Sequence, residues 1–246
     1  EQPFLFICAV MKTNSNTLYI QKLISEGEHI HQDFKFAISD ARKIAKSLSA
    51  FANTEGGRLL VGVKDNGKIA GVRSEEEIYM VEAAATLYCR PEIKLETHIY
   101  HIEGKDVLEV QINESTQKPI YALDENNHPW AYVRIKDENI LANPIHLNIW
   151  KHDREEKRVI ITYTQREQQV LTILKQQGAL TLGQCSKLTR MNRKQISRLL
   201  ADFIRFGLVE QYFEDIHFIF ALKTVNEKNE QKDFLSLHLN KQIISL

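Results

Sequence analysis

The sequence predicts an α+β protein, in which a mixed α/β sheet domain is followed by a winged helix-turn-helix domain. In the first half of the chain, apolar residues alternate with period 2 in some segments and recur with helical spacing in others. In the second half, three short helical patterns precede two strand patterns around a turn. The length of 246 residues is sufficient for two domains that each bury a core. The expected segments are a leader or added stretch at 1–14, the sheet domain at 15–140, a connecting helix at 141–160, the winged helix-turn-helix at 161–223 and a polar tail at 224–246.

The composition excludes several classes of protein. Hydrophobic residues make up 43% of the chain and charged residues 26%, which is typical of a globular protein and not of a disordered one. The three cysteines, Cys8, Cys89 and Cys185, are far apart, which fits a reducing compartment and excludes both a disulfide scaffold and a zinc ribbon. No apolar run is long enough to span a bilayer. We therefore expect a cytoplasmic protein with no membrane partner.

The sheet domain is expected to begin with a helix, a strand and a second helix. Residues 16–26 have apolar side chains at helical spacing, and residues 29–36 alternate as a strand does. Ser39 is a suitable N-cap for the next helix. The apolar stripe of that helix consists of Ala41, Ile44, Ala45, Leu48, Phe51 and Ala52.

The rest of the sheet domain is expected to contain hairpins and one more helix. Asn66-Gly67 between two apolar runs is a strong hairpin signal. Ser74 and Glu77 form a capping-box pattern, which predicts a helix to about Arg90. Further strands are expected at 95–102, 106–112 and 130–135, and the connecting segment is a polar helix at 143–158. The winged helix-turn-helix is expected to contain helices at 165–177, 181–188 and 192–206 and strands at 208–213 and 217–222.

The neutral total charge, with 32 Lys+Arg against 32 Asp+Glu, hides a basic segment. Between Thr164 and Gly207 there are eight basic and two acidic residues, and four of the basic ones surround the start of the third helix. Because the N-terminal residues of a recognition helix meet the bases while cations hold phosphates, this pattern favours binding to double-stranded DNA. The residues expected to contact DNA are Arg190, Asn192, Arg193, Lys194, Gln195, Ser197 and Arg198.

Further expectations follow from this interpretation. The hairpin wing is expected to contact the DNA backbone, and a homodimer is expected on a two-fold site. No cofactor is expected to be required for DNA binding. The alternative interpretation of the same charges is a solvated face on a helical module that contacts protein.

One part of the sheet domain resembles a known family. Ala50-Phe51-Ala52-Asn53-Thr54-Glu55-Gly56-Gly57, followed by the segment 60–72 of the form G-V-x-D-x-G-x-I-x-G-V, closely resembles the Schlafen AlbA-2 domain family, also labelled divergent AAA-4. Asp33-Phe34-Lys35 fits the first element of the family pattern, with Asp in place of the usual Glu. The resemblance covers about residues 20–140. Bacterial members are often joined to a C-terminal winged helix, so the resemblance implies a bacterial transcriptional regulator.

The resemblance also implies an alternative function, because eukaryotic relatives include endoribonucleases with a three-carboxylate site. The matching positions here are Glu28, Asp33 and Asp65. Such a cluster would bind Mg²⁺ or Mn²⁺ and activate water for cleavage of RNA or DNA, with the winged helix as a docking module. A structural interpretation stays open. The odd offset would place Glu28 and Asp33 on opposite sides of one regular strand unless Glu28 precedes it, and Asp65 suits a turn.

Three weaker signals concern other ligands. Gly62–Ile69 nearly matches a P-loop, but Ile69 replaces the hydroxyl residue and a strand follows, so a hairpin explains the segment better and ATP binding has no P-loop to support it. His29 and His31 lie two apart and suit either a metal pair or ordinary surface positions. Four side chains suit either stacking on RNA or single-stranded bases or packing in the sheet: Tyr121, Trp130, Tyr132 and Arg134.

Overall fold

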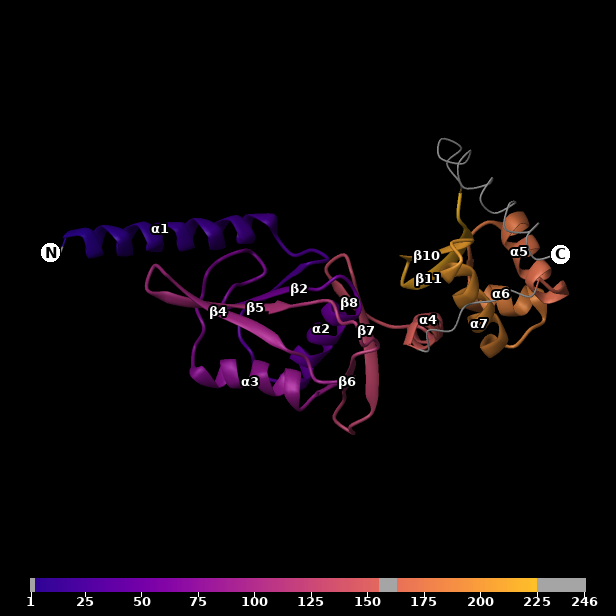
Figure 1. The fold of residues 1–246 in the computed structure, drawn as a ribbon, viewed down its shortest axis with the longest axis horizontal. Helices are drawn as coiled ribbons and strands as arrows, with labels where there is room; N and C mark the ends of the chain where they lie inside the picture. The colour runs from indigo at the N-terminus through magenta and orange to yellow at the C-terminus, as the bar shows by residue number, and fades with distance from the viewer. Residues whose placement is uncertain (1–2, 155–162, 225–246) are drawn as a thin grey trace, which may run out of the picture. The chain divides into compact units, whose positions relative to one another are not determined.

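The computed structural model describes residues 3–154 and 163–224, with side chains from residue 15 onward. The chain divides into two compact units, Glu1–Lys157 and Arg158–Leu246 (Figure 1). Within the described residues, no helix combines the length and the apolar character needed to cross a membrane. The mixed helix and strand content confirms the predicted α+β class.

The first unit is built around a mixed four-stranded sheet in the order β1 (Gln32–Lys35), β2 (Gly57–Val61), β5 (Lys105–Ile112) and β4 (Leu95–Ile102). The β1–β2 pair is parallel and the other pairs are antiparallel. Successive residues of β2 point to opposite faces, so Leu59 and Val61 pack in one apolar cluster and Leu60 in the other.

Helices cover both faces of this sheet (Figure 1). The cluster that contains Leu59 is closed by α2 (Ala41–Asn53) and α3 (Glu75–Thr86), and the cluster that contains Leu60 is closed by the C-terminal part of α1 (Pro3–Glu26). The sequence predicted only residues 16–26 of α1. The helix runs back to Pro3, through most of the stretch that was expected to be a leader.

A second antiparallel sheet flanks α2 in the order β3 (Cys89–Arg90), β6 (Tyr121–Leu123), β7 (Pro129–Ile135) and β8 (Glu138–Leu141). The amide of Asn53 ties the end of α2 to this sheet, because its Nδ2 donates to the Ile120 and Tyr132 carbonyls and its Oδ1 accepts from the Ile120 N–H. Thr54 adds a bond from the Arg134 N–H to its hydroxyl. The Asn-Thr of the sequence motif therefore fixes the contact between helix and sheet.

Two predicted helix starts were wrong in detail. Asp40, and not Ser39, caps α2, because its carboxylate accepts from the Arg42 N–H. Ser74 precedes α3 without a side-chain cap bond. The Glu77 carboxylate is buried and accepts from the Ile38 and Arg73 N–H groups, so it anchors a loop instead of completing a capping box. The helix ends at Thr86 and not near Arg90 because Cys89-Arg90 forms β3.

The connecting helix α4 (Pro144–Arg154) belongs to the first unit. Residues 155–158 of the expected 143–158 helix lie outside the described residues. The same holds for the expected tail at 224–246, apart from residue 224.

The second unit has the predicted order of helices and strands. It contains α5 (Gln165–Gln177), β9 (Leu180–Thr181), α6 (Leu182–Thr189), α7 (Arg193–Arg205), β10 (Val209–Glu214) and β11 (His217–Leu222). β11 pairs with both β10 and β9, which closes the three-stranded sheet of a winged helix. The two-residue β9 was not predicted, because so short a strand has no alternation to detect.

Candidate nucleic-acid interface

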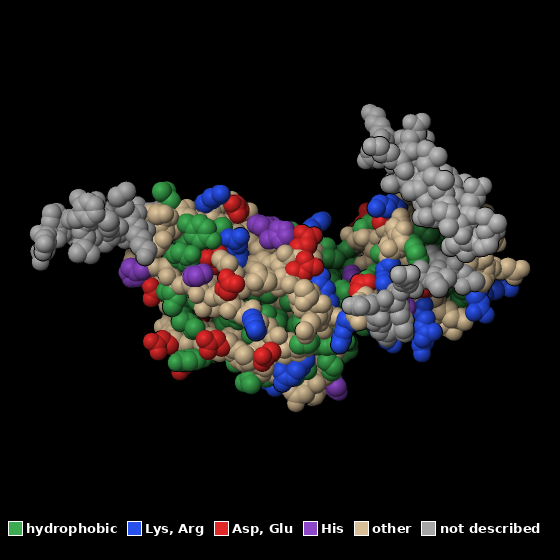
Figure 2. Space-filling view, viewed as in Figure 1, with side chains coloured by type: hydrophobic (Ala, Val, Ile, Leu, Met, Phe, Trp, Pro, Cys, Tyr) green, Lys and Arg blue, Asp and Glu red, His purple; other side chains and the backbone are tan. Residues whose placement is uncertain are grey.

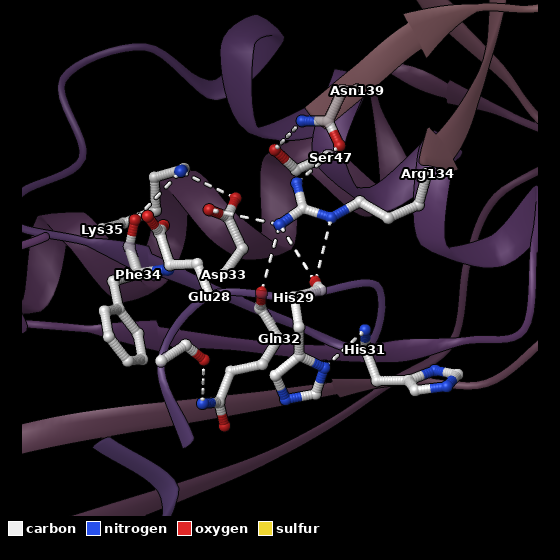
Figure 3. Close-up of polar contacts among 11 residues, drawn as sticks. Glu28, His29, His31, Gln32, Asp33, Phe34, Lys35, Ser47, Arg134 and Asn139 are labelled. Atoms are coloured by element: carbon white, nitrogen blue, oxygen red, sulfur yellow. Dashed lines mark hydrogen bonds and ion pairs between the residues drawn. The ribbon is translucent and has the colours of Figure 1, made fainter. Parts of the chain in front are cut away.

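Glu28 and Asp33 lie side by side at the entrance to β1. Glu28 precedes the strand, and its carboxylate accepts a hydrogen bond from the Phe34 N–H at 2.9 Å (Figure 3). Partial burial, and then a hydrogen bond with Asp33, raise the pKa of Glu28. The position of Glu28 before the strand removes the odd-offset objection, so two of the three predicted carboxylates are brought together.

The charge of Asp33 is balanced by two cations of the same domain. Its carboxylate lies 2.7 Å from the Lys35 ammonium and 3.6 Å from the Arg134 guanidinium. Arg134 is only 2% exposed and also donates to the Gln32 carbonyl at 3.1 Å and to Asn139 at 2.9 Å (Figure 3). The arrangement holds β1 against β7, which is a structural use of Asp33 and of Arg134.

Asp65 does not join this pair. It lies exposed in a turn, where the Gly67 N–H donates to the Lys64 carbonyl at 2.7 Å. Throughout the part of the chain that the structure describes, no three His, Cys, Asp or Glu residues are grouped so that they could hold a metal ion. The expected Glu28, Asp33 and Asp65 triad is therefore not assembled, and the same finding leaves His29 and His31 without a third ligand of these types.

The glycine-rich segment after β2 is a hairpin turn and not a P-loop. Val63 and Ile69 form an antiparallel bridge across the turn, and the next helix, α3, begins only at Glu75. Gly62 has a φ of +89°, and a Cβ there would lie 2.8 Å from the Gly71 backbone. This close approach of two chain segments explains the glycine, as the hairpin interpretation predicted.

The aromatic residues singled out in the sequence differ in their surroundings. Tyr132 and Arg134 are part of the packing between α2 and the second sheet. Trp130 is exposed on one side, and its indole N–H donates to Asp124 at 3.0 Å. Tyr121 is half-buried and lines a groove beside α4. Of the four, Trp130 is exposed and Tyr121 and Tyr132 are half-buried, so these three retain some surface, whereas Arg134 is buried.

A buried charge network under α1 was not predicted from the sequence. Glu109 of β5 is fully buried and accepts hydrogen bonds from the Tyr19 hydroxyl at 2.9 Å and the Tyr100 hydroxyl at 3.2 Å. Arg58 lies 3.4 Å from the same carboxylate. Burial, followed by the Glu109 charge, raises the pKa of Tyr100 to about 12. The signal that could have revealed it is a charged residue in the middle of the apolar run 107–112.

In the second unit, the turn between α6 and α7 presents cations to solvent. Arg190 ends α6 in a left-handed conformation with a φ of 56°, and Arg193 and Lys194 occupy the first turn of α7. Lys194 and Arg198 are four residues apart and therefore share one face of α7. All four side chains are exposed, and within the described residues no ion pair neutralises them.

The polar residues of the same segment have structural roles. Asn192 and Gln195 form a reciprocal capping box, in which the Gln195 N–H donates to Asn192 and the Asn192 N–H donates to Gln195. Ser197 is 3% exposed, and its hydroxyl donates to the Arg193 carbonyl at 2.7 Å. The expectation that Ser197 contacts DNA was therefore wrong. It lies on the buried stripe of α7 with Ile196 and Leu200.

The tip of the hairpin does not suit a phosphate backbone. Glu214, Asp215, Ile216 and His217 form it, so it carries two carboxylates and no Lys or Arg. Asp215 and Ile216 both have positive φ, and Ile216 is 82% exposed. Because two carboxylates would repel phosphates, the expected backbone contact by the wing is not supported. In the first unit, Figure 2 shows Lys and Arg side chains interspersed with Asp and Glu side chains over the visible face, so neither sign of charge dominates there.

Comparison with known proteins identifies part of the chain. Residues 28–143 match the family described as Schlafen, AlbA_2. No curated protein matches the chain. Among solved structures, the DIP2311 protein from Corynebacterium diphtheriae is 15% identical, with a TM-score of 0.41 and coverage of 67% of this chain and 40% of that one. The chain thus spans about 40% of the length of that protein.

Two further solved structures resemble separate parts of the chain. The N-terminal domain of a RecG-related protein from Nitrosomonas europaea is 20% identical, with a TM-score of 0.38 and coverage of 60% of this chain and 95% of that one. A MarR family transcriptional regulator from Silicibacter pomeroyi is 20% identical, with a TM-score of 0.24 and coverage of 31% of this chain and 52% of that one.

Proposed function

We propose that this protein, which carries a Schlafen AlbA_2 domain at residues 28–143, binds double-stranded DNA through the winged helix of its second unit. The observation that carries the proposal is the set of four exposed cations around the start of α7, Arg190, Arg193, Lys194 and Arg198. Exposed cations without an ion-pair partner gain affinity for DNA by releasing counterions from the phosphates.

The geometry of α7 suits the major groove. Its apolar stripe, which includes Ile196, Leu200 and Phe203, is buried against the rest of the unit, so the opposite face is free to meet a ligand. The capping box of Asn192 and Gln195 fixes the first turn, and therefore the positions of Arg193 and Lys194. In this proposal the cations hold phosphates, the amide groups of the same turn lie nearest the bases, and the acidic hairpin tip stays away from the backbone.

The finer parts of the proposal concern regulation. A transcriptional regulator of bacterial type is the role that suits a DNA-binding unit joined to an AlbA_2 domain, and a homodimer on a two-fold site would supply the specificity that one module lacks. In this role the AlbA_2 domain contacts nucleic acid or a nucleotide, or dimerises, and duplex binding requires no cofactor.

The test is a direct binding measurement with the full chain. Fluorescence anisotropy of a labelled random-sequence duplex should show binding that weakens steeply as salt is raised. The charge reversal Lys194→Glu with Arg198→Glu should abolish binding, whereas Lys43→Glu with Lys46→Glu on exposed positions of α2 should leave most of it. Equal binding by the protein and the α7 variant would overturn the proposal. If the duplex binds as proposed, sedimentation with a palindromic duplex would count the protein copies on each duplex.

A metal-dependent nuclease is the alternative function, and one observation favours it. Glu28 and Asp33 lie side by side, and partial burial together with the Asp33 carboxyl raises the pKa of Glu28, as in carboxylate pairs that bind cations or exchange protons. These two residues would hold Mg²⁺ or Mn²⁺ if the protein cleaves RNA or DNA. Asp65 has no part in this version of the proposal.

A further inference from the structure

A groove separates α4 from the beginning of β6 in the first unit. Its volume is about 470 Å³, which lies within the range of sites that bind small molecules. The groove is lined by Pro119, Tyr121, Leu147, Asn148, Lys151 and Arg154. All six residues belong to the first unit, whereas the proposed DNA contact on α7 belongs to the second.

Buried residues and a capped start hold α4 so that one face of the helix lines the groove. Ile145 and Trp150 are buried and anchor the helix on the domain, and the Asn143 side chain accepts from the Ile145 and His146 N–H groups at its start. Leu147, Lys151 and Arg154 follow at i, i+4 and i+7, which places them on one face. A capped and anchored helix presents these groups in a defined arrangement.

The groove is cationic. Lys151 and Arg154 are both exposed, and within the described residues neither forms an ion pair. None of the six residues that line the groove is acidic. An ammonium and a guanidinium one turn apart suit a phosphate, because the guanidinium fork donates two parallel hydrogen bonds to oxygen atoms and the ammonium adds a second positive charge.

The opposite wall of the groove is aromatic and apolar. Tyr121 is held in β6 by pairing with Arg90 of β3 and Ala131 of β7, and it is half-buried. Pro119 adds apolar surface beside it, and α4 contributes the apolar Leu147 and the Asn148 amide, which can both donate and accept. A ring, an amide and two cations in one groove match three features by which a protein recognises a nucleotide: the flat face of the base, its polar edges and the phosphate.

We propose that this groove binds a nucleotide unit, with its base on the Tyr121 ring and its phosphate between Lys151 and Arg154. The unit belongs either to a single strand of nucleic acid or to a free nucleotide, since both present the same chemistry. The site gives the first unit, which contains the AlbA_2 domain, a ligand of its own, whereas the duplex contact lies on α7 of the second unit.

The experiment uses the full chain with Arg193→Ala and Lys194→Ala, so that the α7 contact is weakened. Two probes are titrated by fluorescence anisotropy, a labelled eight-residue oligothymidylate and a labelled adenosine nucleotide. Lys151→Ala with Arg154→Ala should lower the affinity for the probe that binds at least tenfold. For the oligonucleotide, it should also reduce the slope of log K against log salt by about 0.7, which is the value for one phosphate contact on a single strand.

Matched variants distinguish binding in the groove from a general effect of positive charge and from loss of folding. Lys43→Ala with Lys46→Ala removes the same charge from α2 outside the groove and should leave affinity within twofold. Tyr121→Phe should preserve binding, and Tyr121→Leu should weaken it about tenfold because stacking is lost. The tryptophan fluorescence, which comes from Trp130 and from the buried Trp150 of α4, should report a folded first unit in every variant.

The outcomes assign the ligand or reject the site. A preference for the oligonucleotide assigns the groove to single strands, and a preference for the adenosine probe assigns it to free nucleotides. If neither probe binds, or if the Lys151 and Arg154 variant binds as tightly as the Lys43 and Lys46 variant, the proposal is overturned. Loss of duplex binding by α7 variants has no bearing on this result, so the two proposals fail separately.

Discussion

The Arg134 guanidinium lies 3.6 Å from the Asp33 carboxylate and connects β7 to β1, two strands of different sheets. The same guanidinium donates to the Gln32 carbonyl, and its carbon lies 4.9 Å from the centre of the Phe51 ring. One buried cation therefore joins three segments of the AlbA_2 domain. This explains why Asp33 is buried although it is charged.

Removing this cation should destabilise the domain strongly. We expect Arg134→Met to lower the free energy of unfolding by about 3–5 kcal/mol, because it leaves the buried Asp33 carboxylate with Lys35 as its remaining cation and removes a donor from the buried Gln32 carbonyl. Both tryptophans, Trp130 and Trp150, lie in the first unit, so their fluorescence during urea unfolding reports on it. Lys46→Ala, at an exposed position, should change stability by about 0.5 kcal/mol or less. A loss below about 1 kcal/mol for Arg134→Met would contradict this role.

The raised pKa of Glu28 should make stability depend on pH. An acid whose pKa is higher in the folded state stabilises the fold below its unfolded pKa, and this contribution is lost as the pH rises through the folded pKa. Glu28→Gln keeps an acceptor for the Phe34 N–H and removes the charge. The variant should therefore gain stability relative to the unmodified protein as the pH increases from about 4 to 7. Urea midpoints across this range measure the difference, and a difference that grows toward acid would show the opposite shift.

Ser197 and Arg198 are neighbours in sequence with opposite expected effects on DNA binding. Ser197→Ala should leave duplex affinity within about twofold, because the buried hydroxyl bonds only to its own helix. Arg198→Ala should weaken binding about fivefold to tenfold at low salt and reduce its salt dependence. Anisotropy titrations of both variants on one duplex make the comparison. If Ser197→Ala weakened duplex binding more than Arg198→Ala, α7 would have to meet DNA with a different face.

Cleavage assays test the alternative function of the carboxylate pair. The full chain is incubated with tRNA, single-stranded DNA and duplex DNA in the presence of Mg²⁺ or Mn²⁺. We expect the Glu28→Ala, Asp33→Ala variant to show the same cleavage, or the same lack of it, as the unmodified protein. The reason is that Asp33 is already paired with Lys35 and Arg134. Asp65→Ala serves as a separate variant and should behave as the unmodified protein, because Asp65 is an exposed turn residue. Cleavage that requires Asp65 would show that the three carboxylates meet when substrate binds.

The sequence predicted the features that depend on neighbouring residues. The three helices and two strands of the second unit, the β4–β5 hairpin and the turn at Asn66-Gly67 all follow from local periodicity and turn chemistry. Short strands such as β3 and β9 were missed because pairing with distant strands, and not their own pattern, creates them.

The candidate site shows the same division between local and distant effects. Exposure of Arg193 and Lys194 follows from their place opposite an apolar stripe. The burial of Ser197 was readable from the same stripe, since the buried Leu200 and Ala201 follow it at i+3 and i+4, and its hydroxyl can reach the carbonyl four residues before it. The partners of Asp33 were not readable, because Arg134 reaches it only through the packing of two sheets.

The salt dependence of duplex binding tests the central claim most directly. The full chain and its Arg193→Ala, Lys194→Ala variant are titrated with one duplex over a series of salt concentrations. Both substitutions remove cations from a helix N-terminus, where they are unfavourable, so the fold should be retained. The account predicts weaker binding and a slope of log K against log salt that is smaller by about 1.8. Arg166→Ala with Lys175→Ala, on exposed positions of α5, should leave the slope unchanged. An unchanged affinity and slope in the α7 variant would contradict the assignment of the winged helix to DNA.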